Sequence, residues 1–140
     1  MSDAPTERQA HVSERLRSDL IVWFISTRPD GRPHTVPVWF LREGDSYLVF
    51  TRPGSQKVRN LRQNPNVVLA LDDTKGCGDV IIIEGTATLL DEGSIPTTLP
   101  AYVEKYGEEI ANLGWTPENM ATTHGYSQPI RVTLTRTIDW

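Results

Sequence analysis

Hydrophobic residues along the chain either alternate with polar ones or form short blocks rich in valine, isoleucine and aromatic residues. Both patterns are typical of β-strands. They predict six strands, at residues 20–28, 32–42, 46–51, 66–72, 80–90 and 130–138. The joints at residues 29–31 and 43–45 each contain a glycine, Gly31 and Gly44, which can adopt a positive φ. The first three strands are therefore predicted to form a meander of two hairpins.

Four other segments have the spacing of helices: residues 6–19, 55–62, 94–114 and 116–123. In the first, Val12, Leu16 and Leu20 follow one another at intervals of four and form a narrow apolar stripe. In the last, Thr116 is suited to the N-cap and Pro117 to the first helical position.

Six antiparallel strands with short helices predict a mainly β fold, a small six-stranded barrel that is closed or nearly closed, because closure removes exposed sheet edges. Its interior is wide enough only for side chains. A large ligand is therefore expected outside the barrel, in a groove or between two copies of the chain. We expect residues 1–140 to form a single domain.

The composition narrows the possible functions. A formal net charge of -4 argues against a broad basic face for nucleic acid. Cys77 is the only cysteine, which excludes an intramolecular disulfide and cysteine-rich metal sites. No stretch approaches the roughly 20 apolar residues of a membrane span, and the chain begins without a long apolar segment. We expect a cytoplasmic protein that binds neither nucleic acid nor membranes.

No pattern in the sequence indicates a nucleophile with its base or a metal site. The histidines His11, His34 and His124 fall on a predicted helix, a predicted strand and a late loop, and there is no G-x-S-x-G segment. Ligating residues lack the spacing of a tetrahedral metal site. The catalytic residues stay unknown at this stage, and no metal is expected.

The most informative segment runs from Phe50 to Leu61. A strand ends at Thr51, a Pro-Gly turn follows, and a helix begins at Ser55 with Lys57 and Arg59 in its first turns. The free N–H groups and positive dipole at such a helix start suit a phosphate. The alternative is that Ser55 is only an N-cap and that the basic side chains form the solvated face of the helix.

A second unusual feature is Pro37, which interrupts an otherwise regular strand. Proline cannot donate to a ladder, so this strand is predicted to lie at an edge or to bulge. Nearby, Trp39, Phe40 and Trp23 are candidates for a flat aromatic slot. Aromatic residues on barrel strands also serve as ordinary core, which is the alternative here.

Four segments together carry a resemblance to a known family: residues 27–34 leading into Val36-Pro37-Val38-Trp39-Phe40, then Phe50-Thr51, then residues 55–65, and Glu84-Gly85-Thr86-Ala87. In these the chain resembles the pyridoxamine 5'-phosphate oxidase-like superfamily of FMN-binding split β-barrels. It is most similar to the branch of oxidoreductases that depend on the deazaflavin coenzyme F420. The resemblance covers about residues 10–92 and extends to the last strand.

The resemblance implies a homodimer with two flavin-type sites in grooves between the subunits. It implies that the phosphate and its surroundings are bound by Phe50, Thr51, Ser55, Gln56, Lys57 and Arg59. It implies that the ring faces the strand formed by Thr35, Val36, Pro37 and Val38, with Trp39 and Phe40 in the substrate pocket. The helical insert with Tyr102, Tyr106 and Trp115, together with Trp140, is expected to cover the cofactor of the partner subunit.

The chain departs from the oxidases of the superfamily at the phosphate. Those enzymes carry an arginine beside the lysine, where this chain has Gln56, and basic residues on the second strand, where it has Thr35 and Val38. Arg52, Arg59 and Arg62 are candidates to bind the longer anionic tail of F420.

The expected function is hydride transfer from reduced F420 to a small electron-poor organic acceptor, the coenzyme supplying the chemistry. The alternatives are an FMN-dependent oxidoreductase of the pyridoxamine phosphate oxidase type and a non-catalytic carrier of a flavin or haem-type ligand. An oligonucleotide-binding barrel is disfavoured by the net charge of -4.

Overall fold

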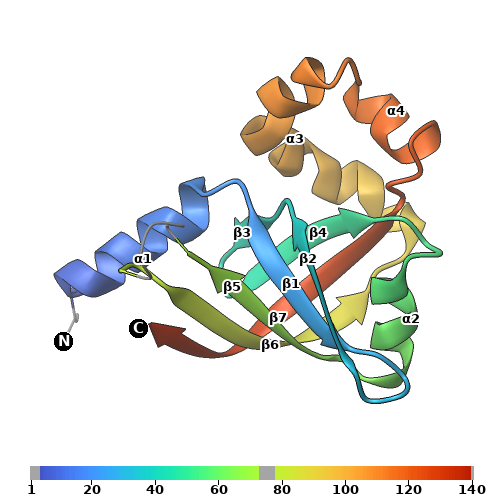
Figure 1. Cartoon of the computed structure of the whole chain (residues 1–140). Helices are drawn as coiled ribbons and strands as arrows, with labels where there is room; N and C mark the ends of the chain where they lie inside the picture. The colour runs from blue at the N-terminus through green and yellow to red at the C-terminus, as the bar shows by residue number, and fades with distance from the viewer. Residues whose placement is uncertain (1–3, 73–77, 140) are drawn as a thin grey trace.

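The computed structural model of the protein describes residues 4–72 and 78–139 (Figure 1). The helices are α1 (Glu7–Ser18), α2 (Gln56–Gln63), α3 (Ile95–Asn112) and α4 (Pro117–Thr122), with a 3-10 turn η1 (Glu92–Ser94) before α3. The strands are β1 (Val22–Thr27), β2 (Pro33–Val38), β3 (Leu41–Glu43), β4 (Ser46–Thr51), β5 (Asn66–Leu71), β6 (Ile81–Leu89) and β7 (Gln128–Asp139). Within the described ranges, no helix combines the length and the apolar character needed to cross a bilayer.

The fold is mainly β, as predicted, but it has seven strands rather than six. They form one antiparallel sheet in the order β2-β1-β5-β6-β7-β4-β3. The predicted strand at residues 32–42 is in fact two strands, β2 and β3, and these lie at the opposite edges of the sheet. Only Trp39 and Phe40 separate them. The sheet must therefore curl into a half-barrel, because two consecutive segments of the chain form both of its edges.

The position of Pro37 agrees with the edge predicted from the sequence. It lies in β2, opposite Trp23 of β1, and β2 pairs with no other strand. The missing N–H of a proline is tolerated at such an edge.

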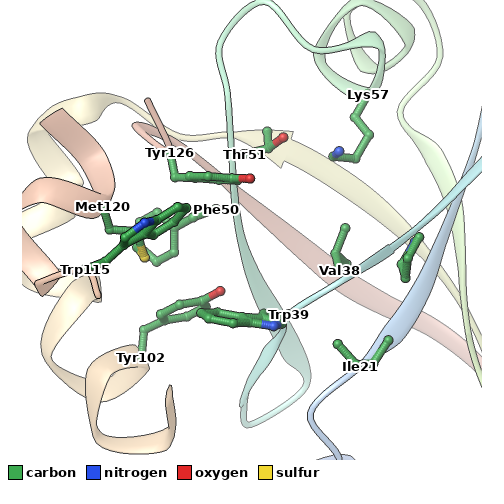
Figure 2. Close-up of a pocket in the computed structure, with 11 residues that line it drawn as sticks. Ile21, Val38, Trp39, Phe50, Thr51, Lys57, Tyr102, Trp115, Met120 and Tyr126 are labelled. Atoms are coloured by element: carbon green, nitrogen blue, oxygen red, sulfur yellow. The ribbon is translucent and has the colours of Figure 1, made fainter. Parts of the chain in front are cut away.

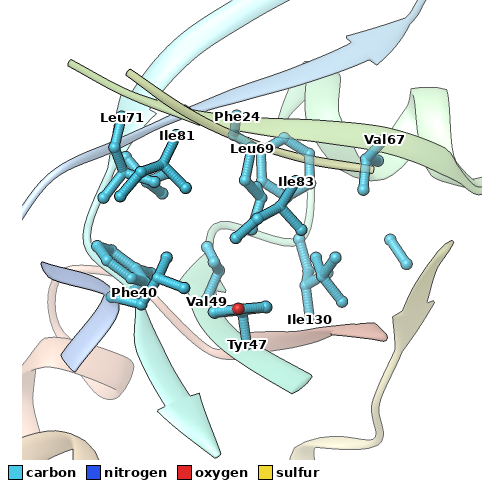
Figure 3. Packing of buried hydrophobic residues seen from close by; sticks show 14 of the residues in the cluster. Phe24, Phe40, Tyr47, Val49, Val67, Leu69, Leu71, Ile81, Ile83 and Ile130 are labelled. Carbon is cyan, nitrogen blue, oxygen red and sulfur yellow. The ribbon is translucent and has the colours of Figure 1, made fainter. Parts of the chain in front are cut away.

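The main core fills the concave side of the curled sheet (Figure 3). Alternate residues of the strands point into it, which explains the period of two in the sequence. Its largest fully buried side chains come from β1, β4, β5, β6 and β7 and from the β2–β3 connection: Phe24, Phe40, Tyr47, Leu69, Leu71, Ile81, Ile83 and Ile130.

A second apolar cluster lies on the other face of β4. Leu48 and Phe50 point to this side and pack against Tyr102, Tyr106 and other residues of the pair α3–α4. In Figure 1, this pair stands beyond one end of the sheet, on the side where β3 and β4 lie. Strand β4 is thus buried on both faces, which accounts for its nearly continuous run of apolar residues.

Helix α1 is anchored to the segment before β6 through Asp79. The Asp79 carboxylate accepts from Arg8 at 2.8 Å and lies 2.6 Å from His11 Nε2, and Arg15 also binds this residue. The predicted apolar stripe is correct for Val12 and Leu16, which are buried. It is wrong for Leu20, which follows the helix and is 39% exposed, because the chain turns into β1 there.

A glycine is required where β6 crosses β7. The register between these strands shifts between Glu84 and Gly85. A Cβ at Gly85 would lie 2.7 Å from both the Thr133 oxygen and the Val132 Cγ1. The strands approach so closely that a side chain at this position would force them apart.

Candidate cofactor-binding site

A cavity of about 270 Å³ opens where the β2–β3 connection meets β4, α2 and the helical pair α3–α4 (Figure 2). We call it the cleft. It is lined by Ile21, Pro37, Val38, Trp39, Phe50, Thr51, Lys57, Tyr102, Trp115, Met120 and Tyr126. The cleft thus unites the two features predicted from the sequence, the start of α2 and the strand interrupted by Pro37.

One end of the cleft is formed by the first turn of α2. Ser55 is its N-cap, as predicted, and its Oγ accepts from the Val58 N–H at 3.5 Å and from the Thr51 hydroxyl at 3.3 Å. This arrangement holds Thr51, which ends β4, against the start of the helix. The hydroxyl of Thr51 and the N–H groups of the first turn are therefore close together, as a phosphate site requires.

Lys57 brings a positive charge to the same end. Its side chain lines the cleft, and Figure 2 shows it extending from α2 toward the space above Val38. Its amine has no hydrogen bond or ion pair with any described residue, and burial lowers the pKa of Lys57. A half-buried ammonium without a counter-charge favours the binding of an anion.

His34 and Arg28 lie beside this positive region, and sequence reasoning did not assign them to the site. Burial lowers the pKa of His34, and the charges of Arg28 and Lys57 lower it further. Its Nδ1 is buried and has no partner among the residues described. The signal was present in the sequence, because His34, Val36 and Val38 alternate on one face of β2.

The other predicted phosphate residues surround the helix start without lining the cleft. Arg59 donates to the Gly54 oxygen and to Gln56 Oε1, both at 2.7 Å, and Gln56 Nε2 donates to Asn60 at 2.8 Å. Both side chains therefore brace the first turn of α2. Their contact with a cofactor stays a prediction.

The predicted ring-facing strand is divided between its two faces. Val36 and Val38 share one face and both pack against the main core, whereas Thr35 and Pro37 are on the exposed face. Val38 and Pro37, at the end of the strand, line the cleft from the two faces. Because β2 is an edge strand, one side of its backbone has no strand partner. Its N–H and C=O groups are available there to the polar rim of a ring.

The aromatic residues of the β2–β3 connection point in opposite directions. Trp39 lines the cleft and stacks on Tyr106 at 4.8 Å with an interplanar angle of 4°. Phe40 is fully buried in the main core, 6.3 Å from Tyr47, and does not line the cleft. Trp23 is 47% exposed on the outer face of β1 and does not line it either. Of the three aromatic candidates, the structure brings only Trp39 to the cleft.

The wall opposite Lys57 comes from the helical insert. Tyr102 and Trp115 line this chain's own cleft, whereas Tyr106 is at the β2–β3 connection, and Trp140 lies outside the described residues. Trp115 stacks on His124 at 3.8 Å. Ile21, Met120 and Tyr126 also line the cleft and were not predicted, since no local pattern links them to the site.

Arg52 is held against this wall. Its Nε donates to the His124 oxygen at 3.1 Å, and its guanidinium lies 4.8 Å from the centre of the Tyr126 ring. Arg52 is thus tied to Tyr126, a residue that lines the cleft, although it does not line the cleft itself.

Across residues 4–72 and 78–139, no group of three or more His, Cys, Asp or Glu side chains is placed to hold a metal ion. Cys77 lies outside the described residues.

Comparison with known proteins agrees with this architecture. Residues 9–140 match the family model described as "Pyridoxamine 5'-phosphate oxidase". No curated protein matches the sequence significantly. Among solved structures, a conserved hypothetical protein from Mycobacterium tuberculosis is similar with a TM-score of 0.75 and 21% identity, over 98% of this chain and 85% of that one.

Two further solved structures carry functional descriptions. A protein described as an F420 reductase has a TM-score of 0.70 and 18% identity, over 96% of this chain and 98% of that one. The heme storage protein HutZ from Vibrio cholerae has a TM-score of 0.76 and 15% identity, over 95% and 94% of the two chains. At these identities the likeness shows a shared fold. Because the family model extends over nearly the whole chain, the protein belongs to the pyridoxamine 5'-phosphate oxidase family.

Proposed function

We propose that the protein is an F420-dependent reductase, which transfers hydride from the reduced deazaflavin to a small electron-poor organic acceptor. The observation that carries the proposal is the composition of the cleft. A half-buried lysine without a counter-charge, Lys57, occupies one end of a cavity whose other walls are largely aromatic. A cofactor with a flat ring and an anionic tail matches this arrangement, the tail at Lys57 and the ring between the aromatic walls.

The residues present fit such a cofactor. Lys57, Thr51 and the N–H groups after Ser55 would bind the phosphate, with Arg28 adding positive charge nearby and His34 offering an unpaired ring nitrogen. Val38 and the free side of β2 would hold the ring. Bound there, the cofactor supplies the hydride, while the protein orients the ring and excludes water from it.

The choice of F420 over FMN rests on charge at the rim. Gln56, where the oxidases have an arginine, is neutral and engaged with Asn60 and Arg59. Arg52, before the start of α2, and Arg62, in its last turn, are both exposed and would suit a longer anionic tail. The similarity to a protein described as an F420 reductase supports this choice.

The partner subunit is proposed to cover the outer face of β1. Trp23 there is 47% exposed and has apolar neighbours in register, Pro37 on β2 and Ala70 on β5. Ile21 is 46% exposed and also lines the cleft, so a second copy bound to this face would reach the site. We therefore propose a homodimer with the cofactor at its interface.

The deciding experiment is a titration of the purified protein with oxidised F420 and, separately, with FMN. The fluorescence of the four tryptophans reports binding, since Trp39 and Trp115 line the cleft. Tight binding of F420 with weak binding of FMN supports the proposal. Preference for FMN makes the protein an FMN-dependent oxidoreductase. Binding without hydride transfer to any acceptor makes it a carrier, and binding of neither cofactor overturns the cofactor assignment.

A further inference from the structure

The hydroxyl group of Tyr102, on α3, has no hydrogen-bond partner in the described part of the chain. The residue is 2% exposed, and its ring packs edge-on against Phe50 at 4.7 Å and against Tyr106 at 4.9 Å. It nevertheless lines the cleft, and Figure 2 shows its hydroxyl on the end of the ring that points toward Tyr126. No described residue forms a hydrogen bond with this hydroxyl. The ring is buried, but the hydroxyl itself is open to the cleft, where a ligand can pair with it.

The neighbouring tyrosine on the same helix shows the contrast. The hydroxyl of Tyr106 contacts the Phe40 N–H, the Phe40 oxygen and the Leu20 oxygen, each at 2.8 Å. Tyr106 is therefore satisfied by the backbone at the β2–β3 connection. Tyr102, one helical turn earlier, is turned to the cleft instead, and its hydroxyl is free for a ligand.

The surroundings determine what kind of atom this hydroxyl would meet. Burial raises the pKa of Tyr102 well above its usual value, and Tyr106 and Tyr126 raise it further. The hydroxyl thus keeps its proton and acts as a donor to an acceptor oxygen. A cationic partner is disfavoured, because Lys57 lines the same cleft. A hydrocarbon partner would leave the hydroxyl unpaired.

The walls beside Tyr102 determine the shape of the ligand. Trp39 presents one face to the cleft, since its other face is stacked on Tyr106. Trp115 is likewise fixed by its stacking on His124. Rigid aromatic walls of this kind favour a flat molecule that offers a π-face.

We propose that the Tyr102 hydroxyl donates a hydrogen bond to a carbonyl oxygen on the rim of a flat ring bound against Trp39. The inference deepens the proposed function, on which it rests for the choice of ligand. Two sources can supply the oxygen: a carbonyl of the cofactor's ring, or a carbonyl of the acceptor substrate. Either way, Tyr102 becomes a ligand-binding residue that distinguishes oxygen-bearing rings from hydrocarbons.

The test compares wild type, Tyr102→Phe and Tyr47→Phe. Tyr47 is a matched control, because it is also 2% exposed but belongs to the main core and does not line the cleft. One arm measures the Kd of oxidised F420 by tryptophan fluorescence. The other measures the Kd of 1-indanone and of indane, which has nearly the same shape without the oxygen, by ligand-observed NMR. Circular dichroism and thermal melting confirm that each variant is folded.

Loss of one neutral hydrogen bond is expected to weaken binding about three- to tenfold. If Tyr102→Phe weakens the binding of F420, the cofactor supplies the oxygen. If it weakens only the binding of indanone, the substrate supplies it. The proposal is overturned if Tyr102→Phe leaves the Kd of both F420 and indanone unchanged. It is also overturned if the binding of indane is weakened as much as that of indanone, or if Tyr47→Phe has the same effect as Tyr102→Phe. Failure of F420 to bind wild type would count against the proposed function alone, since the indanone arm needs no cofactor.

Discussion

The hydroxyl of Tyr106 lies 2.8 Å from the backbone nitrogen of Phe40, at the point where the chain leaves one edge of the sheet and enters the other. No strand pairing is available at this point, because β2 ends at Val38 and β3 begins at Leu41. The Tyr106 hydroxyl takes the place of a strand partner: it accepts from the Phe40 N–H and donates to the Phe40 oxygen. The helical insert is in this way attached to the edges of the half-barrel.

Tyr106→Phe is expected to reduce the free energy of unfolding by about 1–3 kcal/mol, because it leaves buried polar backbone groups without their partner. Urea denaturation followed by circular dichroism measures the change. Tyr102→Phe is the control on the same helix, and a clearly smaller loss is expected there, since its hydroxyl has no partner among the described residues. Equal losses in the two variants would mean that the bonds to Phe40 do not stabilise the fold.

Lys57→Ala is expected to weaken the binding of F420 roughly 10- to 100-fold, the usual effect of losing one charge-assisted hydrogen bond. The Kd is measured by tryptophan fluorescence. Arg17→Ala removes the same charge from α1, where Arg17 is paired with Glu14 and exposed, and it should leave the Kd unchanged. An unchanged Kd in Lys57→Ala would show that the phosphate does not bind at this end of the cleft.

Binding of inorganic phosphate is expected to raise the pKa of His34. In the free protein this pKa is lowered by burial and by the charges of Arg28 and Lys57, and an anion between these groups would stabilise the protonated ring. NMR titration of the imidazole protons with and without phosphate checks this. His11, on α1, serves as the internal reference and should not respond. A His34 pKa that is insensitive to phosphate would place the anion elsewhere.

Acid is expected to weaken the attachment of α1. Hydrogen bonds from His11 and Arg8 hold the pKa of Asp79 well below its usual range, so this carboxylate stabilises the folded state at pH above about 4. The stabilisation is lost as the pH falls through the lower pKa of the folded state. Urea denaturation of wild type and Asp79→Asn should show a large difference at pH 7 that shrinks toward pH 2. Glu104→Gln, which removes an exposed carboxylate of α3, should show no such convergence.

Gly85→Ala is expected to destabilise the protein by about 1–3 kcal/mol, the usual cost of overpacking. The added Cβ would lie 2.7 Å from the backbone oxygen of Thr133, which cannot move without breaking the β6–β7 pairing. Gly93→Ala is the control, because a Cβ there meets no atom within 4 Å. Thermal melting of both variants gives the comparison, and equal melting temperatures would show that the strands can separate at little cost.

Local signals in the sequence predicted much of the fold. Ser55 and Thr116 are N-caps, and Pro117 begins α4. Pro37 lies in an edge strand, where its missing N–H is tolerated. The division of residues 32–42 could not be predicted in the same way. Val36, Val38 and Phe40 keep a period of two through the break, and no glycine or turn marks it. The break results from the curling of the whole sheet, which is a long-range effect.

Only one end of the cleft could be predicted from the sequence, because only that end is formed by a local motif. Its Lys57 end is a local motif of strand, turn and helix cap, and a local motif is visible in one stretch of sequence. Its aromatic end joins β2 to residues far along the chain, such as Tyr102 and Tyr126. The spacing of Tyr102, Tyr106 and Ile110 predicts a buried helical face, but spacing alone does not tell which surface that face covers.

The place of β7 within the sheet has a consequence for how the protein is made. The strand lies between β6 and β4, although it is the last of the seven in the chain. Until it is synthesised, β2-β1-β5-β6 and β4-β3 are two separate ladders that share no hydrogen-bonded pair. The two ladders are therefore joined only when β7 pairs with both β6 and β4, and the cleft, which draws on both ladders, is completed only by that joining.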